Sequence, residues 1–379
     1  MNLRKLSYSV LLTGVIAGSL VSTAQAQEFI PMPSKLDSLK LYGDARFRFQ
    51  AEEINSGDTR SRFRYRVRAG ADASFKDTGF KMGIRLETAE ASDSTNATLG
   101  GFFDKAGDEL FVGKAYLSYE GDDFEILLGK HSHPFTIDSA FWDSDIAPEG
   151  ISESFSVGDM SYNFGQYIIS DERENRSGSE SDAFMFVAQA VWANDNITVA
   201  PTFLTTSGDR ASARQEQGGF NNENGVDFFD DFMVVQVPFT VKVEGGKIYG
   251  TIGMNLEADT MNPATPYYGG SAWDGGDEDL FFNFGYKYGS AKKPGTWEAS
   301  LEYRHIEGAA YTPNLSDSDF AKNSNNHAGF VLKYKYAVTE FFSIGGAYMD
   351  SSAIEDAFNA DVVSSSDVKL LQVDAAIKF

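Results

Sequence analysis

The sequence predicts an all-β protein, a transmembrane antiparallel up-and-down β-barrel of 16 strands. Three observations lead to this prediction. Segments of about 10 residues with alternating apolar and polar side chains recur from residue 39 to the end, the connections between them are alternately short and long, and the last segment has the same alternation. A soluble β-sandwich gives no reason for its connections to be sorted in this way, whereas a membrane barrel does.

The predicted strands follow one another without any helical period of useful length between them. They are residues 39–51, 59–75, 80–90, 109–120, 124–131, 151–157, 160–170, 182–193, 197–207, 228–243, 248–259, 279–289, 296–307, 327–338, 341–352 and 367–379. The hairpin at 151–170 has the weakest pattern. Counts of 14, without that hairpin, and of 18 are the alternatives.

Each strand has one apolar face and one mostly polar face, as the strand at 279–289 illustrates. Leu280, Phe282 and Phe284 lie on one face, and Asn283 and Lys287 lie on the other. In a barrel in lipid the apolar face points outward and the polar face lines the lumen. Aromatic residues also crowd the strand ends beside the short turns, which is typical of rings at the level of the lipid headgroups.

The two ends of the chain predict export and membrane insertion. Arg4 and Lys5 precede an apolar run and the small residues that end at 26, which is the layout of a signal peptide. We therefore expect a signal peptide at 1–26, a short segment at 27–38 and the barrel at 39–379. The last strand ends on Phe379, which resembles the signal that outer-membrane proteins present to their insertion machinery.

The composition excludes several classes of protein. There are 32 basic and 55 acidic residues and the net charge is −23, which argues against nucleic acid as a partner. No cysteine is present, so neither disulfides nor thiolate metal sites can form. The aromatic content of 14% is too high for a disordered acidic chain.

The stretch RSRFRYRVRAG at residues 60–70 places an arginine at every second position. In a strand this spacing puts all the arginines on one face and the residues between them on the other. The arginines that we expect to line the lumen, two of them from the first strand, are Arg46, Arg48, Arg60, Arg62, Arg64, Arg66 and Arg68.

Several segments of the first half of the chain resemble one family, the putative porins of Gram-negative outer membranes, which are related in style to general and phosphate-selective porins. The segments are LYGDARFRFQAE at 41–52, RSRFRYRVRAG at 60–70, STNATLGGFFDK at 94–105, KAYLSYE at 114–120, LLGKHSHPF at 127–135 and FWDSDIAPEG at 141–150. The resemblance implies 16 strands, an assembly of three barrels, and a third long loop that folds inward and narrows the pore.

The third long loop in this chain is 132–150, and its acidic residues are the second set of candidate site residues. They are Asp138, Asp143, Asp145 and Glu149, with Glu153 directly after the loop. We hypothesise that the arginine wall faces these carboxylates across the constriction and that the resulting field orients small hydrophilic solutes. In a purely structural alternative, the arginines pair with lumen carboxylates such as Asp44, Asp72 and Glu87. Both roles are compatible.

Other chemistry has weaker support in the sequence. His131 and His133 form half of a metal site, but only His305 and His327 remain to complete it, so no metal or cofactor is expected. No motif places a serine beside a histidine, so no catalytic residue and no enzyme is predicted. The long loops at 171–182, 208–231 and 260–279 are acidic, which suits solvation or divalent cations that bridge to lipopolysaccharide phosphates.

These observations predict a passive channel of the cell outer membrane. We expect it to conduct small hydrophilic solutes and ions, to contact membrane lipid and lipopolysaccharide, and to assemble as a homotrimer. A channel selective for anions such as phosphate is the first alternative, because seven arginines lie on two adjacent strands. An exported glycan-binding or adhesin β protein is the second alternative.

Overall fold

The computed structural model describes residues 35–55, 57–89, 94–99, 109–170, 183–207, 233–258, 278–312, 314–354 and 366–379. These residues belong to one compact unit, Lys35–Phe379. The predicted signal peptide at 1–26 lies outside the described residues, as does most of the predicted segment at 27–38. No helix in the described part of the chain has the length and apolar content needed to cross a membrane.

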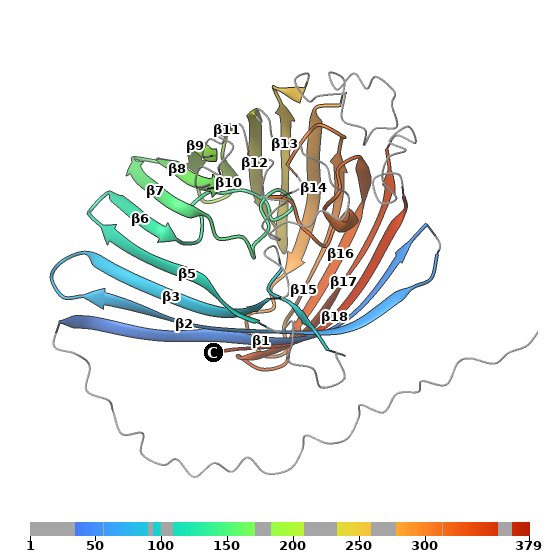
Figure 1. Cartoon of the computed structure of the whole chain (residues 1–379), viewed down its shortest axis with the longest axis horizontal. Coiled ribbons are helices and arrows are strands. Elements are labelled where there is room, and N and C mark those ends of the chain that lie inside the picture. The colour runs from blue at the N-terminus through green and yellow to red at the C-terminus, as the bar shows by residue number, and fades with distance from the viewer. Residues whose placement is uncertain are drawn as a thin grey trace, which may run out of the picture. The chain divides into compact units, whose positions relative to one another are not determined.

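The strands form one antiparallel sheet that closes on itself (Figure 1). Its first strand pairs along one edge with the second strand and along the other edge with the last, so the ring has no free edge there. The strands are β1 Leu36–Ile54, β2 Arg60–Phe75, β3 Phe80–Ala89, β4 Ala97–Thr98, β5 Glu109–Glu120, β6 Phe124–Lys130, β7 Glu149–Val157, β8 Met160–Ser170, β9 Ala183–Ala193, β10 Ile197–Val199, β11 Thr202–Ser207, β12 Met233–Val243, β13 Gly246–Asn255, β14 Leu280–Gly289, β15 Trp297–Ile306, β16 His327–Ala337, β17 Phe342–Ala353 and β18 Val368–Lys378. A short 3-10 helix, η5, spans Ala321–Asn323.

The barrel wall is formed by 16 strands, as predicted, although the described part of the chain contains 18 separate strand segments. β10 and β11 both pair with β9 and with β12, so together they form one barrel strand that is interrupted at Ala200 and Pro201. Proline has no N–H to donate to a neighbouring strand, which explains the interruption. β4 is a two-residue strand that adds to β2 beyond the end of β3 and does not span the barrel.

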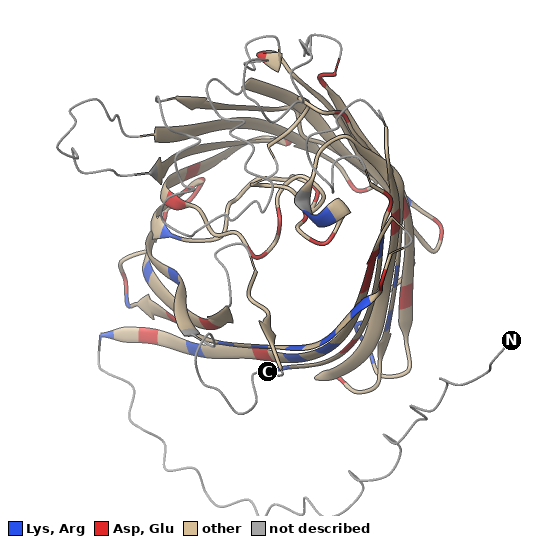
Figure 2. Cartoon of the chain, turned by 45° about the vertical axis from the view of Figure 1, so that its right-hand side comes forward, with Lys and Arg blue, Asp and Glu red and all other residues tan. Residues whose placement is uncertain are grey.

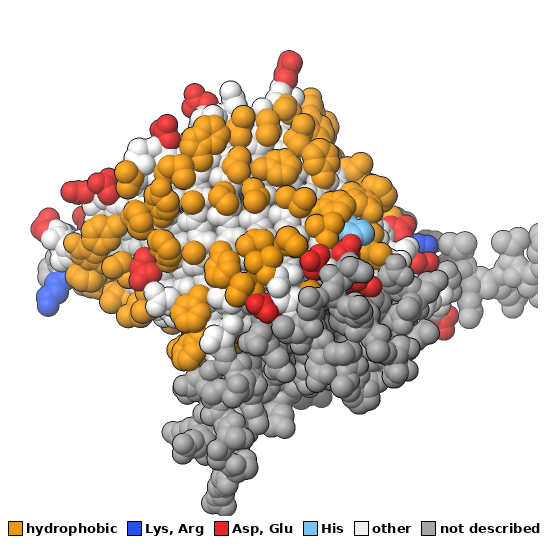
Figure 3. Space-filling model, turned by 90° about the horizontal axis from the view of Figure 1, so that it is seen from above, with side chains coloured by type: hydrophobic (Ala, Val, Ile, Leu, Met, Phe, Trp, Pro, Cys, Tyr) orange, Lys and Arg blue, Asp and Glu red, His pale blue; other side chains and the backbone are white. Residues whose placement is uncertain are grey.

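The outer and inner faces of the barrel strands differ in polarity, as the alternation predicts. On β2 the Phe63 side chain is 62% exposed on the outer face, whereas its neighbour Arg64 is 8% exposed on the inner face. Apolar side chains cover the outer surface of the sheet on the face shown in Figure 3, and acidic side chains gather at its edges. An apolar exterior of this kind suits a hydrocarbon solvent and not water.

The short turns carry the residues that tight reversals need. β12 and β13 are joined by two residues, and one of them, Gly245, has a φ of 78°, which favours glycine. Aromatic rings of neighbouring strands meet near these turns. The ring centroids of Phe80 and Tyr119 are 4.9 Å apart, and those of Tyr288 and Trp297 are 5.4 Å apart. These contacts agree with the predicted aromatic belt.

The terminal residue Phe379 completes the seam of the barrel. Its backbone N–H donates to the carbonyl of Gly43 at 3.1 Å and its carbonyl accepts from the N–H of Gly43 at 3.0 Å. Its ring is exposed. The role of Phe379 in recognition by the insertion machinery remains a prediction from the sequence.

The outward direction of Leu301, near the middle of β15, gives a test of the fold. We expect Leu301→Arg to lower the free energy of unfolding in lipid vesicles by about 2–4 kcal/mol, because it places a charge in the hydrocarbon. The neighbouring change Ser300→Arg places the same side chain in the lumen and is the matched control. Urea titration of both variants measures the difference. Equal losses in the two variants would contradict the assigned faces.

Candidate functional site

The predicted arginines of β1 and β2 lie side by side on the inner wall. In the antiparallel register Arg46 is directly opposite Arg66, and Arg48 is directly opposite Arg64. Like charges at opposed positions destabilise a sheet unless other groups compensate them. Arg60, at the first position of β2, is exposed.

Carboxylates of the barrel wall supply this compensation. Asp44 accepts from Arg66 at 2.8 Å and from Arg68 at 2.7 Å. Asp374 of β18 accepts two hydrogen bonds from Arg48, at 2.7 and 2.9 Å. The predicted pairing of the arginines with wall carboxylates is therefore confirmed for Asp44.

Arg46, and the two other wall carboxylates that were predicted to pair with the arginines, have other partners. Arg46 donates to Asn96 and lies 3.9 Å from Asp374. Glu87 pairs with Arg85 of its own strand at 2.6 Å, and Asp72 accepts from the Tyr116 hydroxyl at 3.0 Å. Asp72 and Glu87 therefore do not pair with the arginines of β1 and β2, whose charge is neutralised locally by Asp44 and Asp374.

The segment 131–148 between β6 and β7, called the first loop here, contacts the inner wall directly. Asp145 lies 3.5 Å from Arg66 and 3.4 Å from Arg68, and it also accepts from the Thr95 hydroxyl at 2.9 Å. The first loop and the arginine wall therefore touch at Asp145, and no open path separates them at this point. Asp138 closes a turn in the same loop through the N–H of Ala140.

Two acidic residues of the candidate constriction set, Glu149 and Glu153, lie in β7. The pairing of β6 with β7 extends to Lys130 and Glu149, and the Glu149 carboxylate lies 2.9 Å from the Lys130 ammonium. Glu153 is opposite Ile126 and Phe164, two outward-facing residues, so it shares the outer face of the sheet. The placement of Glu149 within the loop is wrong, because strand pairing continues past the expected boundary. Glu153 follows the loop as predicted, but it faces outward and so does not belong with the constriction carboxylates.

A second inner segment, residues 307–326 between β15 and β16, was not predicted from the sequence. It is called the second loop here. Its Tyr311 is fully buried and donates to the carbonyl of Phe141 in the first loop at 2.6 Å. The N–H of Asp143 donates to the carbonyl of Leu315 at 2.7 Å. The apolar run Ala309, Ala310, Tyr311 inside a polar connection was the available signal.

The two loops share an apolar core with the inner wall. The ring of Phe281 on β14 lies 4.7 Å from Phe141 and 4.8 Å from Tyr311, measured between centroids. Side chains of β8, β9, β11, β12 and of β15 to β18 join this cluster. Figure 2 shows both loops within the ring of strands. The lumen thus contains a packed apolar core, and charged residues line other parts of the inner wall, including parts of β15 to β18.

Arg304 of β15 attaches the second loop to the wall. Its guanidinium is completely buried and lies 2.6 Å from Glu302 and 2.7 Å from Asp317 of the loop. Glu302 also accepts from the Tyr249 hydroxyl and from the Asn283 amide, both at 3.0 Å. Burial alone would raise the pKa of Asp317, but the attraction of Arg304 outweighs it and lowers that pKa.

Carboxylates of the two loops meet where the loops contact each other. Asp143 accepts from the backbone N–H and the hydroxyl of Ser318, both at 3.2 Å. Burial, followed by repulsion from Asp317 and from Asp145, raises the pKa of Asp143 to about 7. The charge at this contact therefore changes near neutral pH.

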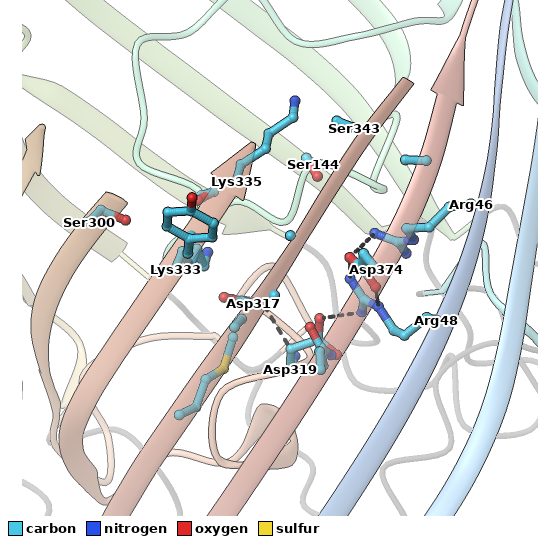
Figure 4. Close-up of a pocket in the computed structure, with 18 of the residues that line it drawn as sticks. Arg46, Arg48, Ser144, Ser300, Asp317, Asp319, Lys333, Lys335, Ser343 and Asp374 are labelled. Atoms are coloured by element: carbon cyan, nitrogen blue, oxygen red, sulfur yellow. Dashed lines mark hydrogen bonds and ion pairs between the residues drawn. The ribbon is translucent and has the colours of Figure 1, made fainter. Parts of the chain in front are cut away.

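A cavity of about 400 Å³ lies between the loops and the charged wall. Figure 4 shows Asp317 and Asp319 of the second loop beside it, with Lys333 and Lys335 on one side and Arg46 and Arg48 on the other. Strands β14 to β18, β1 and β2 provide the wall. In the described part of the lumen, this is the place where charges of both signs surround open space.

His131 and His133 take part in packing. The His133 ring is 4.6 Å from that of Trp142, and burial lowers the His133 pKa to about 4, which keeps the ring neutral. His131 is buried and shares a hydrogen bond with the carbonyl of Ser132. The described residues include no cluster of three or more metal-ligating side chains of the His, Cys, Asp or Glu types.

Comparison with known proteins agrees with this geometry. Residues 50–192 match the putative porin family. The match runs from the last residues of β1 to β9. It therefore includes most of the arginine wall and the whole first loop. Comparison with curated protein sequences finds no match.

Several solved structures share the fold of this chain. The structure of Salmonella typhi OmpF in complex with daunomycin has 12% sequence identity, covers 90% of this chain and 97% of its own, and gives a TM-score of 0.56. Pseudomonas putida OprB has 10% identity, coverage of 90% and 94%, and a TM-score of 0.53. Vibrio cholerae OmpT, in its trimer form, has 11% identity, coverage of 90% and 99%, and a TM-score of 0.52. The family match and the fold support an outer-membrane porin channel.

The pKa of Asp143 predicts a pH-dependent selectivity. As the pH rises through about 7, Asp143 loses its proton and adds one negative charge beside the cavity. Zero-current potentials under a KCl gradient should therefore shift toward cation preference between about pH 6 and pH 8. Asp143→Asn keeps an acceptor oxygen for Ser318 and should remove the shift. An identical pH profile in the variant would contradict the assignment.

The Arg304 attachment predicts a change in conductance. Arg304→Met leaves Glu302 and Asp317 buried without their cation, at a cost of about 3–5 kcal/mol. We expect the second loop to detach and the single-channel conductance to rise. Arg85→Met, which removes an ion pair within β3, is the control and should leave the conductance close to that of the unchanged protein. Equal conductance in all three proteins would show that Arg304 does not hold the constriction.

Proposed function

We propose that the protein is a porin, a passive water-filled channel for small hydrophilic solutes and ions. The observation that carries this proposal is the cavity beside the two loops, inside a closed barrel with an apolar exterior. The first and second loops occupy the lumen together and narrow the path to the charged side of the wall. No chemical step and no resident cofactor belong to this function.

The chain is proposed to reside in the bacterial outer membrane, with its short turns in the periplasm and its long loops outside. The apolar outer surface contacts lipid, and the three-barrel assembly is supported by the trimer form of OmpT, which shares the fold. Divalent cations that bridge to lipopolysaccharide remain a proposal for the acidic loops. Loops 171–182 and 208–231 lie outside the described residues, as does nearly all of 260–279.

An exported soluble β protein that binds glycans is less compatible with this structure. Leu41, Phe47 and Phe63 on the outer face are each at least 62% exposed, and similar residues continue around the sheet. Water would be a poor solvent for such a surface, since a soluble monomer rarely exposes large contiguous apolar patches. The lipid-facing barrel accounts for the same residues without a further partner.

The proposed function predicts discrete conductance steps in a planar bilayer. Protein purified from membranes of cells that express the whole chain should insert and give steps of uniform size in KCl, because the cavity provides a path through the barrel. Its migration on a gel should differ between unheated and boiled samples. Boiled protein is the negative control. Folded, heat-modifiable protein that gives no steps would refute the channel.

A further inference from the structure

Three lysines border the cavity with no carboxylate in direct contact. Glu302 and Asp317 attract Lys333 from farther away, Glu298 attracts Lys335, and Asp44 attracts Lys378. Lys333 and Lys335 lie on β16 and Lys378 ends β18. In the described part of the chain, none of the three ammonium groups has an ion pair or a side-chain hydrogen bond. The arginines of the cavity differ, since Arg48 and Arg66 each lie within 3.5 Å of two carboxylates.

Small residues on the strand between β16 and β18 leave room in front of these lysines. In the register of β16 and β17, Lys333 is opposite Ala347 and Lys335 is opposite Gly345. Ser343 follows at the next inward position of β17, and Ser300 of β15 is opposite Lys333 on the other side. The cavity therefore extends over a floor of small residues that is bordered by ammonium groups and hydroxyls.

Apart from Asp143, the carboxylates around the cavity contact arginines or Lys287, and two of these arginines, Arg48 and Arg304, each contact two carboxylates. Asp374 and Asp319 lie within 3.2 Å of Arg48, and Asp317 lies 2.7 Å from Arg304. Glu298 lies 2.9 Å from Lys287, and Asp145 contacts Arg66 as described above. Asp143 carries only part of a charge near neutral pH, because burial and its acidic neighbours raise its pKa to about 7. Seven cationic side chains and six carboxylates line the cavity, and because Asp143 is only partly charged, the balance of charge there is slightly positive.

We propose that Lys333, Lys335 and Lys378 form a binding site for small oxyanions, such as carboxylates and phosphate, with the hydroxyls of Ser300 and Ser343 as additional donors. An ammonium group is a compact charge with three donors and suits oxyanions of different shapes. Several such groups in sequence attract an anion at each step and still allow it to leave. This site rests on the proposed channel function and assigns anion selectivity to the lysines and not to the arginine wall.

The test compares three proteins, each purified from membranes of cells that express the whole chain. They are the unchanged protein, the triple variant Lys333→Gln, Lys335→Gln, Lys378→Gln, and the control Lys292→Gln, Lys293→Gln, which removes charges from an exposed short turn. We expect the triple variant to lower the anion-to-cation permeability ratio by about fivefold or more, measured as zero-current potential under a KCl gradient. The control should retain the ratio of the unchanged protein.

A second measurement uses the unchanged protein and does not depend on the folding of any variant. Millimolar inorganic phosphate, and separately acetate, should reduce the chloride current through the channel, and the reduction should be weaker in the triple variant. Steps with an unaltered permeability ratio in the triple variant, or a chloride current insensitive to both oxyanions, would overturn the lysine site and leave the channel intact. Absence of steps from folded protein would overturn the channel and the site together.

Discussion

Complete pairing of the backbone is the constraint on which the rest of this structure depends. A strand in hydrocarbon must satisfy its N–H and C=O groups within the sheet, because lipid offers no partner. β1 meets this requirement by pairing with β2 on one edge and with β18 on the other, and the backbone of Phe379 continues the seam to Gly43. Once the ring is closed, apolar side chains can face outward, and the interior becomes the protected side of the protein.

Because the ring is closed, the two loops pack against each other inside the barrel. Phe141 of the first loop, Tyr311 of the second loop and Phe281 of β14 form a core inside the lumen that resembles the core of a soluble domain. Arg304 adds a buried electrostatic attachment through Asp317. The two loops therefore hold each other through direct contacts, and a change in either loop should affect the position of both.

The sequence predicted the barrel strands well and the packing of the loops inside the barrel poorly, and the reason is physical. Alternation is a local property, so the strands from Arg60 and from Phe80 are visible in a few residues of sequence. The end of the first loop, which was predicted from the sequence as the third long loop, depends on how far Lys130 and Glu149 continue to pair. The role of Tyr311 depends on Phe141, which is 170 positions away. Contacts at such separations leave no periodic pattern in either segment.

The same difference between local and long-range information applies to charge. A count of residues describes an acidic chain of net charge −23 with an arginine-rich strand, and this count suggests the arginines as the anion path. Selectivity depends instead on which charges remain without partners in the lumen. Asp44, Asp374 and Asp145 pair with the arginines, whereas the residues of β17 opposite Lys333 and Lys335 are Ala347 and Gly345, which carry no charge. An acidic protein can in this way present a positive path, because pairing decides the field that a passing ion meets.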